Sequence, residues 1–319
     1  MFMKINIAYA CNEAYIVQTG ISMLSLFENN KKIEEIVIYF IDMGTTEESK
    51  NDLKEIAREY NRKLIIIPFS DWENELPVDS TGRHIKSVYA KIFFGRIKEI
   101  DRILYIDSDT VIVDDLQELW DTKMGICAIA GVQTVNTLAM RQKIELTKDD
   151  LVINDGIVLI DLALWRQYKY EKRCIEFIKK WNGNPPVLSE GTINAVCKDY
   201  IYKLDLKYNL TSMSKDYSAK EIKLISNADY YTQEEIEKAA AEPCIIHYVS
   251  GFHERPWCKN STHPFKDEYL KYKKMSKWKD KPLEDGKLSK RTKFTARLHR
   301  ILPTFLFCRL YHWFGRSNR

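Results

Sequence analysis

The feature that most constrains the fold is an alternation of short apolar segments and helical patterns at the N-terminus. The segments Lys4–Cys11, Glu35–Asp42 and Leu64–Pro68 are rich in the apolar and β-branched residues that favour strands. Between them, apolar residues recur every three or four positions over 15–29 and 45–60, as on helices packed against a sheet. This β-α-β-α-β order predicts an α/β domain with a largely parallel, Rossmann-like sheet flanked by helices.

The same reasoning extends the pattern along the chain, where no repeat or linker interrupts it. Thr45 and Glu48 have the spacing of a capping box at the start of the second helix. In such sheets ligands bind at the carboxyl ends of strands, so the polar residues that follow each apolar run are the candidates for function. Further strands are expected at Ile103–Ile106, Ile126–Val132, Gly156–Asp161 and Ile245–Val249, and helices at Leu162–Trp181 and Thr192–Cys197.

Two carboxylates, Asp107 and Asp109, interrupt one of these apolar segments with only Ser108 between them. Residues two apart in an extended chain point the same way, so both carboxylates can reach one ion. Placing two like charges beside an apolar strand is costly without a compensating cation. The motif therefore suggests a metal site, although an acidic turn at a strand end is the simpler alternative because Asp-x-Asp is common by chance.

Composition excludes several classes of protein. The chain has 319 residues, 45% of them hydrophobic and 29% charged, as in ordinary folded proteins. The apolar segment at the N-terminus is too short for a signal peptide, and no apolar run is long enough to span a membrane, so we expect a cytoplasmic protein. The seven cysteines are scattered without a Cys-x-x-Cys pair, which predicts free thiols rather than disulfides or a zinc site.

Three further motifs follow in chain order: Asn154-Asp155-Gly156, the segment 189–194, and a histidine motif over 247–257. In order and spacing, together with Asp107-Ser108-Asp109, they resemble glycosyltransferase family 8, which includes bacterial lipopolysaccharide galactosyltransferases and glycogenin. The resemblance covers about residues 4–282, and we therefore expect a catalytic domain over 1–282. It implies a GT-A fold, a UDP-sugar donor, a Mn2+ ion and retention of configuration at the anomeric carbon.

The resemblance also implies a ligand set for the metal. Asp107 and Asp109 match the family's metal-binding pair, and His247 matches its third protein ligand. Two carboxylates and an imidazole suit Mn2+ and tolerate Mg2+, and they leave positions for diphosphate oxygens. On its position alone, His247 could equally be a hydrogen-bonded histidine at a strand end.

Several residues match the family's donor-binding positions, with substitutions. Asn12 replaces the usual aspartate of the nucleotide loop but can still pair with the uracil edge. Lys91 stands where relatives usually have arginine, and Arg255 where many have lysine, so bidentate phosphate contact is expected at the second position. Either cation could instead be simply solvated. The expected donor-binding set is Ala10, Cys11, Asn12, Tyr15, Lys91, Asp107, Ser108, Asp109, Asn154, Gly251 and Arg255.

The resemblance places three candidate catalytic residues beside the donor sugar. Asn154 matches the asparagine that contacts the sugar, and Asp155 replaces a small alanine or serine. Ser189-Glu190 stands where many relatives have Asp-Gln, and the second position lies nearest the reacting carbon. Glu190 could stabilise positive charge there, attack the carbon or only bind the sugar. The alternative is an acidic residue favoured by a helix N-terminus.

The C-terminal segment 283–319 differs from the rest, because no acidic residue follows Asp285 while lysines and arginines are interleaved with large apolar residues. This composition favours a helical, basic amphipathic extension that binds an anionic membrane surface, which would be the inner face of the plasma membrane. A helical cap packed on the catalytic domain is the alternative. The basic tail alone is weak support for nucleic-acid binding, and we expect none.

Two rival functions remain for the α/β core. A sugar nucleotidyltransferase should have a glycine-rich phosphate loop after the first strand, but 10–15 contains no glycine. A non-catalytic module that binds a sugar nucleotide or a glycan would not need two strand-end carboxylates and a distant histidine. The sequence thus favours transfer of a hexose to a glycan, glycolipid or glycoprotein acceptor, without distinguishing glucose from galactose.

Overall fold

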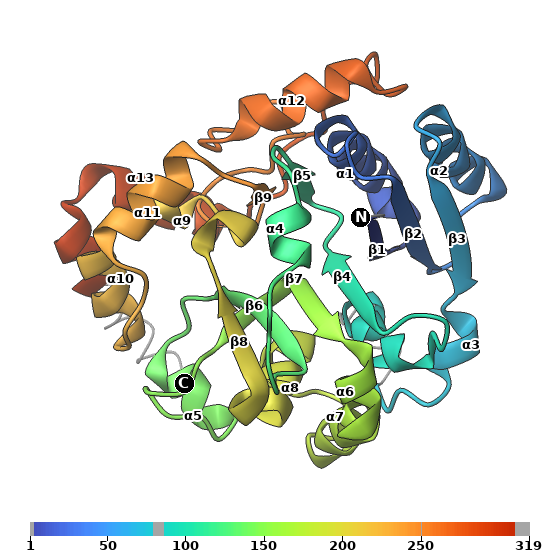
Figure 1. The fold of residues 1–319 in the computed structure, drawn as a ribbon. Helices are drawn as coiled ribbons and strands as arrows, with labels where there is room; N and C mark the ends of the chain where they lie inside the picture. Colours follow the sequence, from blue (N-terminus) through green and yellow to red (C-terminus); the bar gives the residue numbers. More distant parts are fainter. Residues whose placement is uncertain (1–2, 79–85, 250, 310–319) are drawn as a thin grey trace.

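A mixed seven-stranded sheet organises the computed structural model, which describes residues 3–78, 86–249 and 251–309 (Figure 1). Its strand order is β3-β2-β1-β4-β7-β6-β8. Strands β1 to β4 pair in parallel, β7 runs antiparallel to both β4 and β6, and β8 is parallel to β6. The strands are β1 Lys4–Cys11, β2 Glu35–Asp42, β3 Lys63–Pro68, β4 Arg102–Ile106, β6 Ile129–Gln133, β7 Ile153–Asp161 and β8 Ile201–Leu204.

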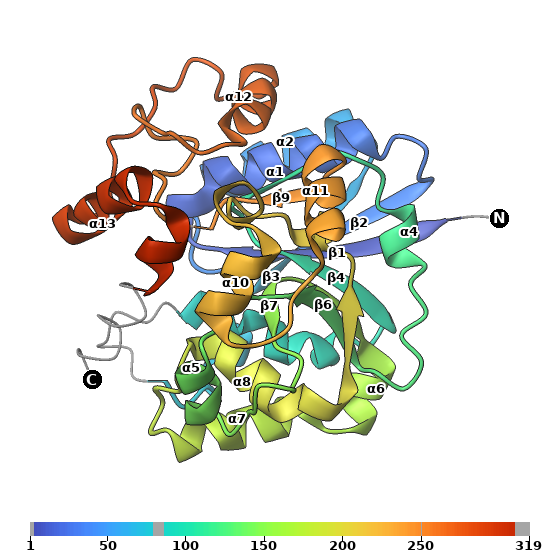
Figure 2. The ribbon, with the colours of Figure 1, turned by 90° about the vertical axis from the view of Figure 1, so that its left-hand side faces the viewer.

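Helices cover both faces of the sheet, as Figure 2 shows. One face buries Ile5, Ile7 and Tyr9 of β1 against α1 and α2, and the other buries Ala8 with apolar residues of α6 and α7. This alternation follows from the period of two in a strand. In the part of the chain that the structure describes, the α-helices of six residues or more are α1 Ile16–Asn29, α2 Glu47–Glu59, α5 Leu138–Lys143, α6 Leu162–Gln167, α7 Tyr170–Lys180, α8 Leu188–Cys197, α10 Ala219–Ser226, α11 Gln233–Ala241, α12 Lys266–Met275 and α13 Lys290–Ile301.

The predicted α/β fold is confirmed, with local corrections. The N-cap of α2 is Thr46, whose hydroxyl accepts a hydrogen bond from Ser49 N, whereas Thr45 hydrogen-bonds Asp42, so the expected capping box is wrong. The helix expected over 162–181 is two helices, because Lys169 adopts a left-handed conformation between them. Strand β6 begins three residues later than expected, and Ile126 is 68% exposed.

A second, two-stranded sheet was not expected from the sequence. Strand β5 (Thr110–Ile112) pairs antiparallel with β9 (Ile245–His247), which is shorter than the predicted strand. The pairing places Thr110 opposite His247. It therefore brings the histidine motif beside the residues that directly follow β4.

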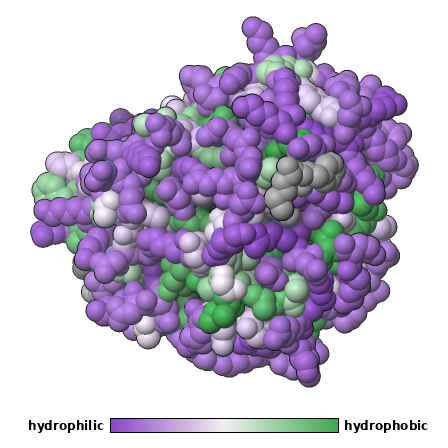
Figure 3. Space-filling model, viewed as in Figure 1, coloured by the Kyte–Doolittle hydropathy of each residue, from purple (hydrophilic) through white to green (hydrophobic). Residues whose placement is uncertain are grey.

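The C-terminal segment packs partly on the body of the protein. Phe307 and Cys308 are buried in the main apolar cluster, while Phe294, Ile301 and Phe305 are exposed. The helix α13 ends before Pro303, and 304–309 is helical again. Hydrophilic residues cover most of the face in Figure 3. Within the described ranges, none of the helices has the length and apolar character needed to cross a membrane.

Candidate active site

The polar residues that follow β1 and β4 meet the start of β7 and the end of β9 at one edge of the sheet. Since β7 runs antiparallel to β4, its first residues lie beside the last residues of β4. Asp107 N donates to the carbonyl oxygen of Gly156 at 2.7 Å, which fixes the two segments together. After the roles that the family resemblance predicts for them, we call Asp107, Asp109 and His247 the metal half of the site and Lys91, Asn154, Asp155, Ser189 and Glu190 the sugar half.

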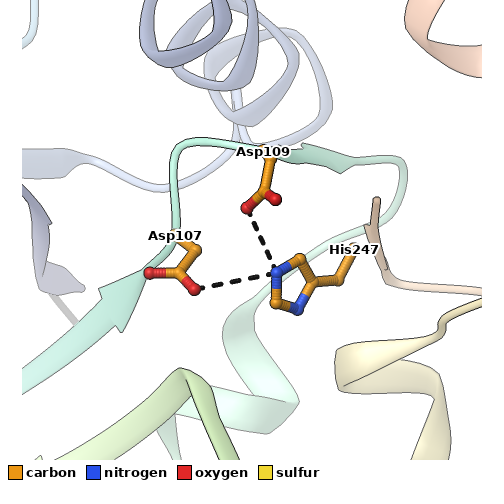
Figure 4. Close-up of side chains that lie close together, drawn as sticks. All are labelled: Asp107, Asp109 and His247. Atoms are coloured by element: carbon orange, nitrogen blue, oxygen red, sulfur yellow. Dashed lines mark hydrogen bonds and ion pairs between the residues drawn. The ribbon is translucent and has the colours of Figure 1, made fainter. Parts of the chain in front are cut away.

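The metal half gathers three side chains that can hold one divalent cation (Figure 4). One ligand atom from each of Asp107, Asp109 and His247 lies within 4.8 Å of the others. Nε2 of the buried His247 lies 3.1 Å from Asp109 Oδ1 and 3.7 Å from Asp107 Oδ2. Two carboxylates and one imidazole form a donor set that suits Mn2+ or Mg2+.

The electrostatics of the metal half are compatible with a bound cation. Burial raises the pKa of Asp107, and Asp109 adds to this rise although Lys91 opposes it. Burial also acts to raise the pKa of Asp109, but His247 and Arg255 outweigh it and hold that pKa below its usual range. Arg255 pairs directly with Asp109, and the Tyr105 hydroxyl donates to Asp107 Oδ1 at 2.6 Å.

A glycine is required where the two halves of the site meet. A Cβ atom on Gly156 would lie 2.4 Å from His247 Cε1 and 2.6 Å from Asp107 Oδ2. Both distances are shorter than van der Waals contact, so any side chain at this position would displace the two metal-half residues. The glycine of the Asn-Asp-Gly motif therefore permits the close approach of β7 to the cluster.

In the sugar half, the charge of the Asp155 carboxylate is balanced by neighbouring side chains. Lys91 is 2% exposed, and its Nζ lies 3.0 Å from Asp155 Oδ2 and donates to the Asp155 carbonyl at 2.7 Å. The Ser189 hydroxyl donates to the same carboxylate oxygen at 2.5 Å. The ammonium also lies 4.3 Å from the centre of the Tyr105 ring. The Asp155 charge is thus satisfied without an external cation.

Glu190 lies in the first turn of α8 and faces Asn154. Asn154 Nδ2 donates to Glu190 Oε2 at 2.9 Å. Burial, with the negative charge of Asp155 as a second cause, raises the pKa of Glu190 to about 8. The side chain is therefore largely protonated at neutral pH, unlike an ordinary surface carboxylate.

The residues after β1 line a cavity of about 180 Å³ next to the metal half. Asn12 Oδ1 accepts a hydrogen bond from Ala14 N at 3.1 Å, which leaves its amide nitrogen as the free group. The Tyr15 ring packs edge-on against Trp257, with 6.5 Å between the ring centres. The cavity is lined by Ala10, Cys11, Asn12, Tyr15, Ser87, Val88, Tyr105, Asp107, Ser108 and Asp109.

Comparison with known proteins decides the family. The family model described as glycosyl transferase family 8 matches residues 6–261. The chain belongs to glycosyltransferase family 8. The resemblance of its motifs to this family is thereby confirmed.

Two bacterial proteins and one solved structure illustrate how this family 8 chain resembles known proteins at low sequence identity. It is 25% identical to General stress protein A of Bacillus subtilis over 279 residues, which cover 86% of this chain and 94% of the relative. It is 24% identical to lipopolysaccharide 1,3-galactosyltransferase of Salmonella typhimurium over 307 residues, 92% of this chain and 85% of the relative. The crystal structure of the galactosyltransferase LgtC with donor and acceptor sugar analogs superposes with a TM-score of 0.70 at 19% identity, covering 86% of this chain and 96% of that chain. This likeness establishes the GT-A fold.

The family 8 fold brings most of the predicted site residues together, but not all in the expected manner. Lys91 points at Asp155 instead of the cavity, and the buried Ser108 hydroxyl accepts from Thr19. Burial raises the pKa of Cys11 to about 12, so its thiol is unreactive. Gly251 is exposed and is not among the residues that line the cavity.

Two residues at the site were missed by reasoning from sequence. Tyr105 precedes Asp107 by two positions, so the alternation of strand side chains could have placed it on the same side. Asn209 ends a short 3-10 helix, Leu206–Asn209, and hydrogen-bonds both His247 and Asn154. No local signal identifies it, because its neighbours along the chain carry none of the site's chemistry.

Proposed function

We propose that this family 8 glycosyltransferase transfers glucose or galactose from a UDP-sugar to an acceptor, with retention of configuration and with Mn2+, or Mg2+, as its metal. The observation that carries the proposal is the meeting of Asp107, Asp109 and His247 beside a cavity at the edge of the sheet. A module that only bound sugars would not need this concentration of negative charge. A transferase needs it, because its leaving group is an anionic diphosphate.

We assign the metal half and the cavity to the donor's UDP group. Asp107, Asp109 and His247 would hold the metal ion, which supplies Lewis-acid stabilisation to the departing diphosphate. Arg255 is a fixed cation at the same place through its pair with Asp109. The free amide nitrogen of Asn12 and the ring of Tyr15 are assigned to the uracil base. The proposed donor-binding set also includes Ala10, Cys11, Ser108 and Gly251. These residues would contact the donor with backbone atoms or shape the site around it.

We assign the sugar half to the hexose and the chemical step. Asn154 and Asp155 would position the sugar, and Lys91 would hold Asp155 in place through their ion pair. Glu190 would act in its ionised form, either by stabilising positive charge at the anomeric carbon or by attacking it. Because its pKa is about 8, this role predicts that turnover rises with pH through that value.

The acceptor is proposed from the relatives and from the C-terminal segment. Two relatives are named as lipopolysaccharide galactosyl- and glucosyltransferases, which favours a glycan on a lipid over a glycoprotein. We propose that 1–282 is catalytic and that 283–319 binds an anionic membrane surface. The exposed Phe294, Ile301 and Phe305, together with the lysines and arginines of α13, have the composition of an interfacial segment. This would place the enzyme at the inner face of the plasma membrane.

The test is release of UDP from a panel of UDP-sugars by the pure protein, with Mn2+, with Mg2+ and with a chelator. We expect release from UDP-glucose or UDP-galactose that requires the metal. Release from no UDP-sugar, or equal release with the chelator, would overturn the proposal.

A further inference from the structure

Asn209 connects the two halves of the site by hydrogen bonds. It is 2% exposed, its Oδ1 lies 2.9 Å from His247 Nδ1, and its Nδ2 donates to Asn154 Oδ1 at 2.8 Å. Asn154 in turn donates to Glu190. A continuous chain of side chains therefore runs from the imidazole of the metal half to the carboxyl group of the sugar half.

A backbone group fixes the direction of every hydrogen bond in this chain. Gly156 N donates to Asn154 Oδ1 at 3.1 Å, and a backbone N–H can only donate. The atom that Asn154 turns toward Gly156 and Asn209 is therefore its oxygen. Asn209 must face that oxygen with its amide nitrogen, which leaves its own oxygen for His247. An amide oxygen only accepts, so His247 must carry a proton on Nδ1.

This tautomer is the one that a metal ligand at His247 requires. Without a metal, Nε2 hydrogen-bonds Asp109 Oδ1 at 3.1 Å, and a carboxylate oxygen can only accept. Because the other proton is held on Nδ1, it is the Nε2 lone pair that becomes available when a cation replaces this hydrogen bond. We propose that Asn209 is a positioning residue that sets the tautomer and the ring orientation of His247 for metal binding, and ties that orientation to Asn154 in the sugar half. The proposal rests on the proposed function only for the role of Asn154.

Two substitutions separate the two connections. Asn209→Ala removes both, and loss of the partner of a metal-bound histidine typically weakens metal binding by about 10- to 100-fold. Asn209→Asp keeps an acceptor for His247, but its second oxygen would face the oxygen of Asn154. Asn154 cannot turn its amide to relieve this, because Gly156 N would then face an NH2 group. We therefore expect Asn209→Asp to bind Mn2+ within about threefold of the wild type and to lower kcat by at least about tenfold.

The measurements are the Kd of Mn2+ alone by calorimetry, kcat and KM for the active UDP-sugar, and the proton on His247 Nδ1 by 15N NMR of the metal-free protein at alkaline pH. Asn30→Ala is the matched control, since Asn30 is also a buried asparagine and its side chain hydrogen-bonds Leu26, Asp114 and Leu116, which lie outside both halves of the site. It should lower the thermal midpoint without changing Mn2+ affinity or the tautomer.

The inference stands if Nδ1 of the wild type carries a proton, if Asn209→Ala loses Mn2+ affinity and if Asn209→Asp loses turnover alone. It is overturned by an unprotonated Nδ1 in the wild type, by unchanged Mn2+ affinity in Asn209→Ala, or by an equal loss of affinity and turnover in both variants. The tautomer and the Mn2+ affinity do not depend on any sugar. If no UDP-sugar is turned over but these two readouts behave as expected, the proposed function fails and the role of Asn209 remains.

Discussion

The two halves of the site differ in how the negative charge of their buried carboxylates is balanced. In the sugar half, Asp155 has an ammonium and a hydroxyl as partners, and Glu190 keeps its proton up to a pKa of about 8. In the metal half, Asp107 and Asp109 lie beside one imidazole, and the guanidinium of Arg255 pairs with Asp109 but not with Asp107 among the described contacts. The sugar half is complete in itself, whereas the metal half retains negative charge that a divalent cation can neutralise.

This difference indicates which substitutions should affect binding of the metal and which should affect the protein itself. Asp107, whose pKa is raised by burial, contributes little to stability in its ionised form. A carboxylate paired inside the protein contributes through its partner, and removal of that partner leaves a buried charge.

The largest effect is expected in the metal half. Asp109→Ala removes one proposed metal ligand and should lower metal-dependent release of UDP by at least about a thousandfold, roughly 4 kcal/mol of transition-state stabilisation. Its thermal midpoint should fall, because Arg255 and His247 lose their carboxylate partner, so rates are compared where the variant is folded. Asp121→Ala, at an exposed position, is the control for loss of a carboxylate. Wild-type rates in a folded Asp109→Ala protein would remove the metal half from the mechanism.

In the sugar half, the effect should instead fall on stability. Lys91→Met leaves Asp155 buried without its cation, and we expect a loss of about 3 kcal/mol in the free energy of unfolding, measured with urea. The double variant Lys91→Met, Asp155→Asn should recover most of that loss, because the unpaired charge is gone. If the double variant is as unstable as the single one, the ion pair is not what stabilises this half.

Glu190→Gln tests whether the protonated or the ionised carboxyl group acts. With a pKa of about 8, only about a tenth of the side chains are ionised at pH 7. If the ionised form acts, kcat of the wild type should rise by up to about tenfold between pH 7 and pH 9. Glu190→Gln should lack this rise, with kcat reduced and KM little changed. An identical pH profile in both proteins would exclude Glu190 as the titrating group.

The smallest effect on the chemistry is expected from the C-terminal segment, which lies outside both halves. Serine at the exposed positions Phe294, Ile301 and Phe305 should weaken co-sedimentation with anionic vesicles by about tenfold or more. Release of UDP in solution should stay within about twofold of the wild type. Serine at the buried Phe307 is the contrast, since it should lower stability. Unchanged vesicle binding in the triple variant would leave this segment as a structural cap.

The elements of the fold that the sequence predicts well are those set by periodicity. Strands β1 and β2 have the expected bounds because each is a run of apolar residues between polar ones. The break between α6 and α7 was missed, since Lys169 takes a left-handed conformation that lysine rarely adopts. The choice of Thr46 over Thr45 as N-cap depends on the contact of Thr45 with Asp42, which no local pattern encodes.

For the candidate site, motifs predicted the groups but not their partners. Asp107, Asp109 and His247 could be named because motif spacing marks them, and the structure brings their side chains together. That Lys91 would bind Asp155, or that Asn209 would join His247 to Asn154, depends on contacts between distant segments. Such contacts exist only once the sheet has formed.

The central claim is transfer of a hexose from a UDP-sugar with retention, and hydrolysis of the donor tests it without knowledge of the acceptor. The α-linked UDP-hexose that the panel identifies is incubated with the protein and Mn2+ and quenched with chelator at early times. The anomer of the released sugar is then read by 1H NMR before mutarotation. The account predicts α-hexose as the first product. A β-hexose would contradict it.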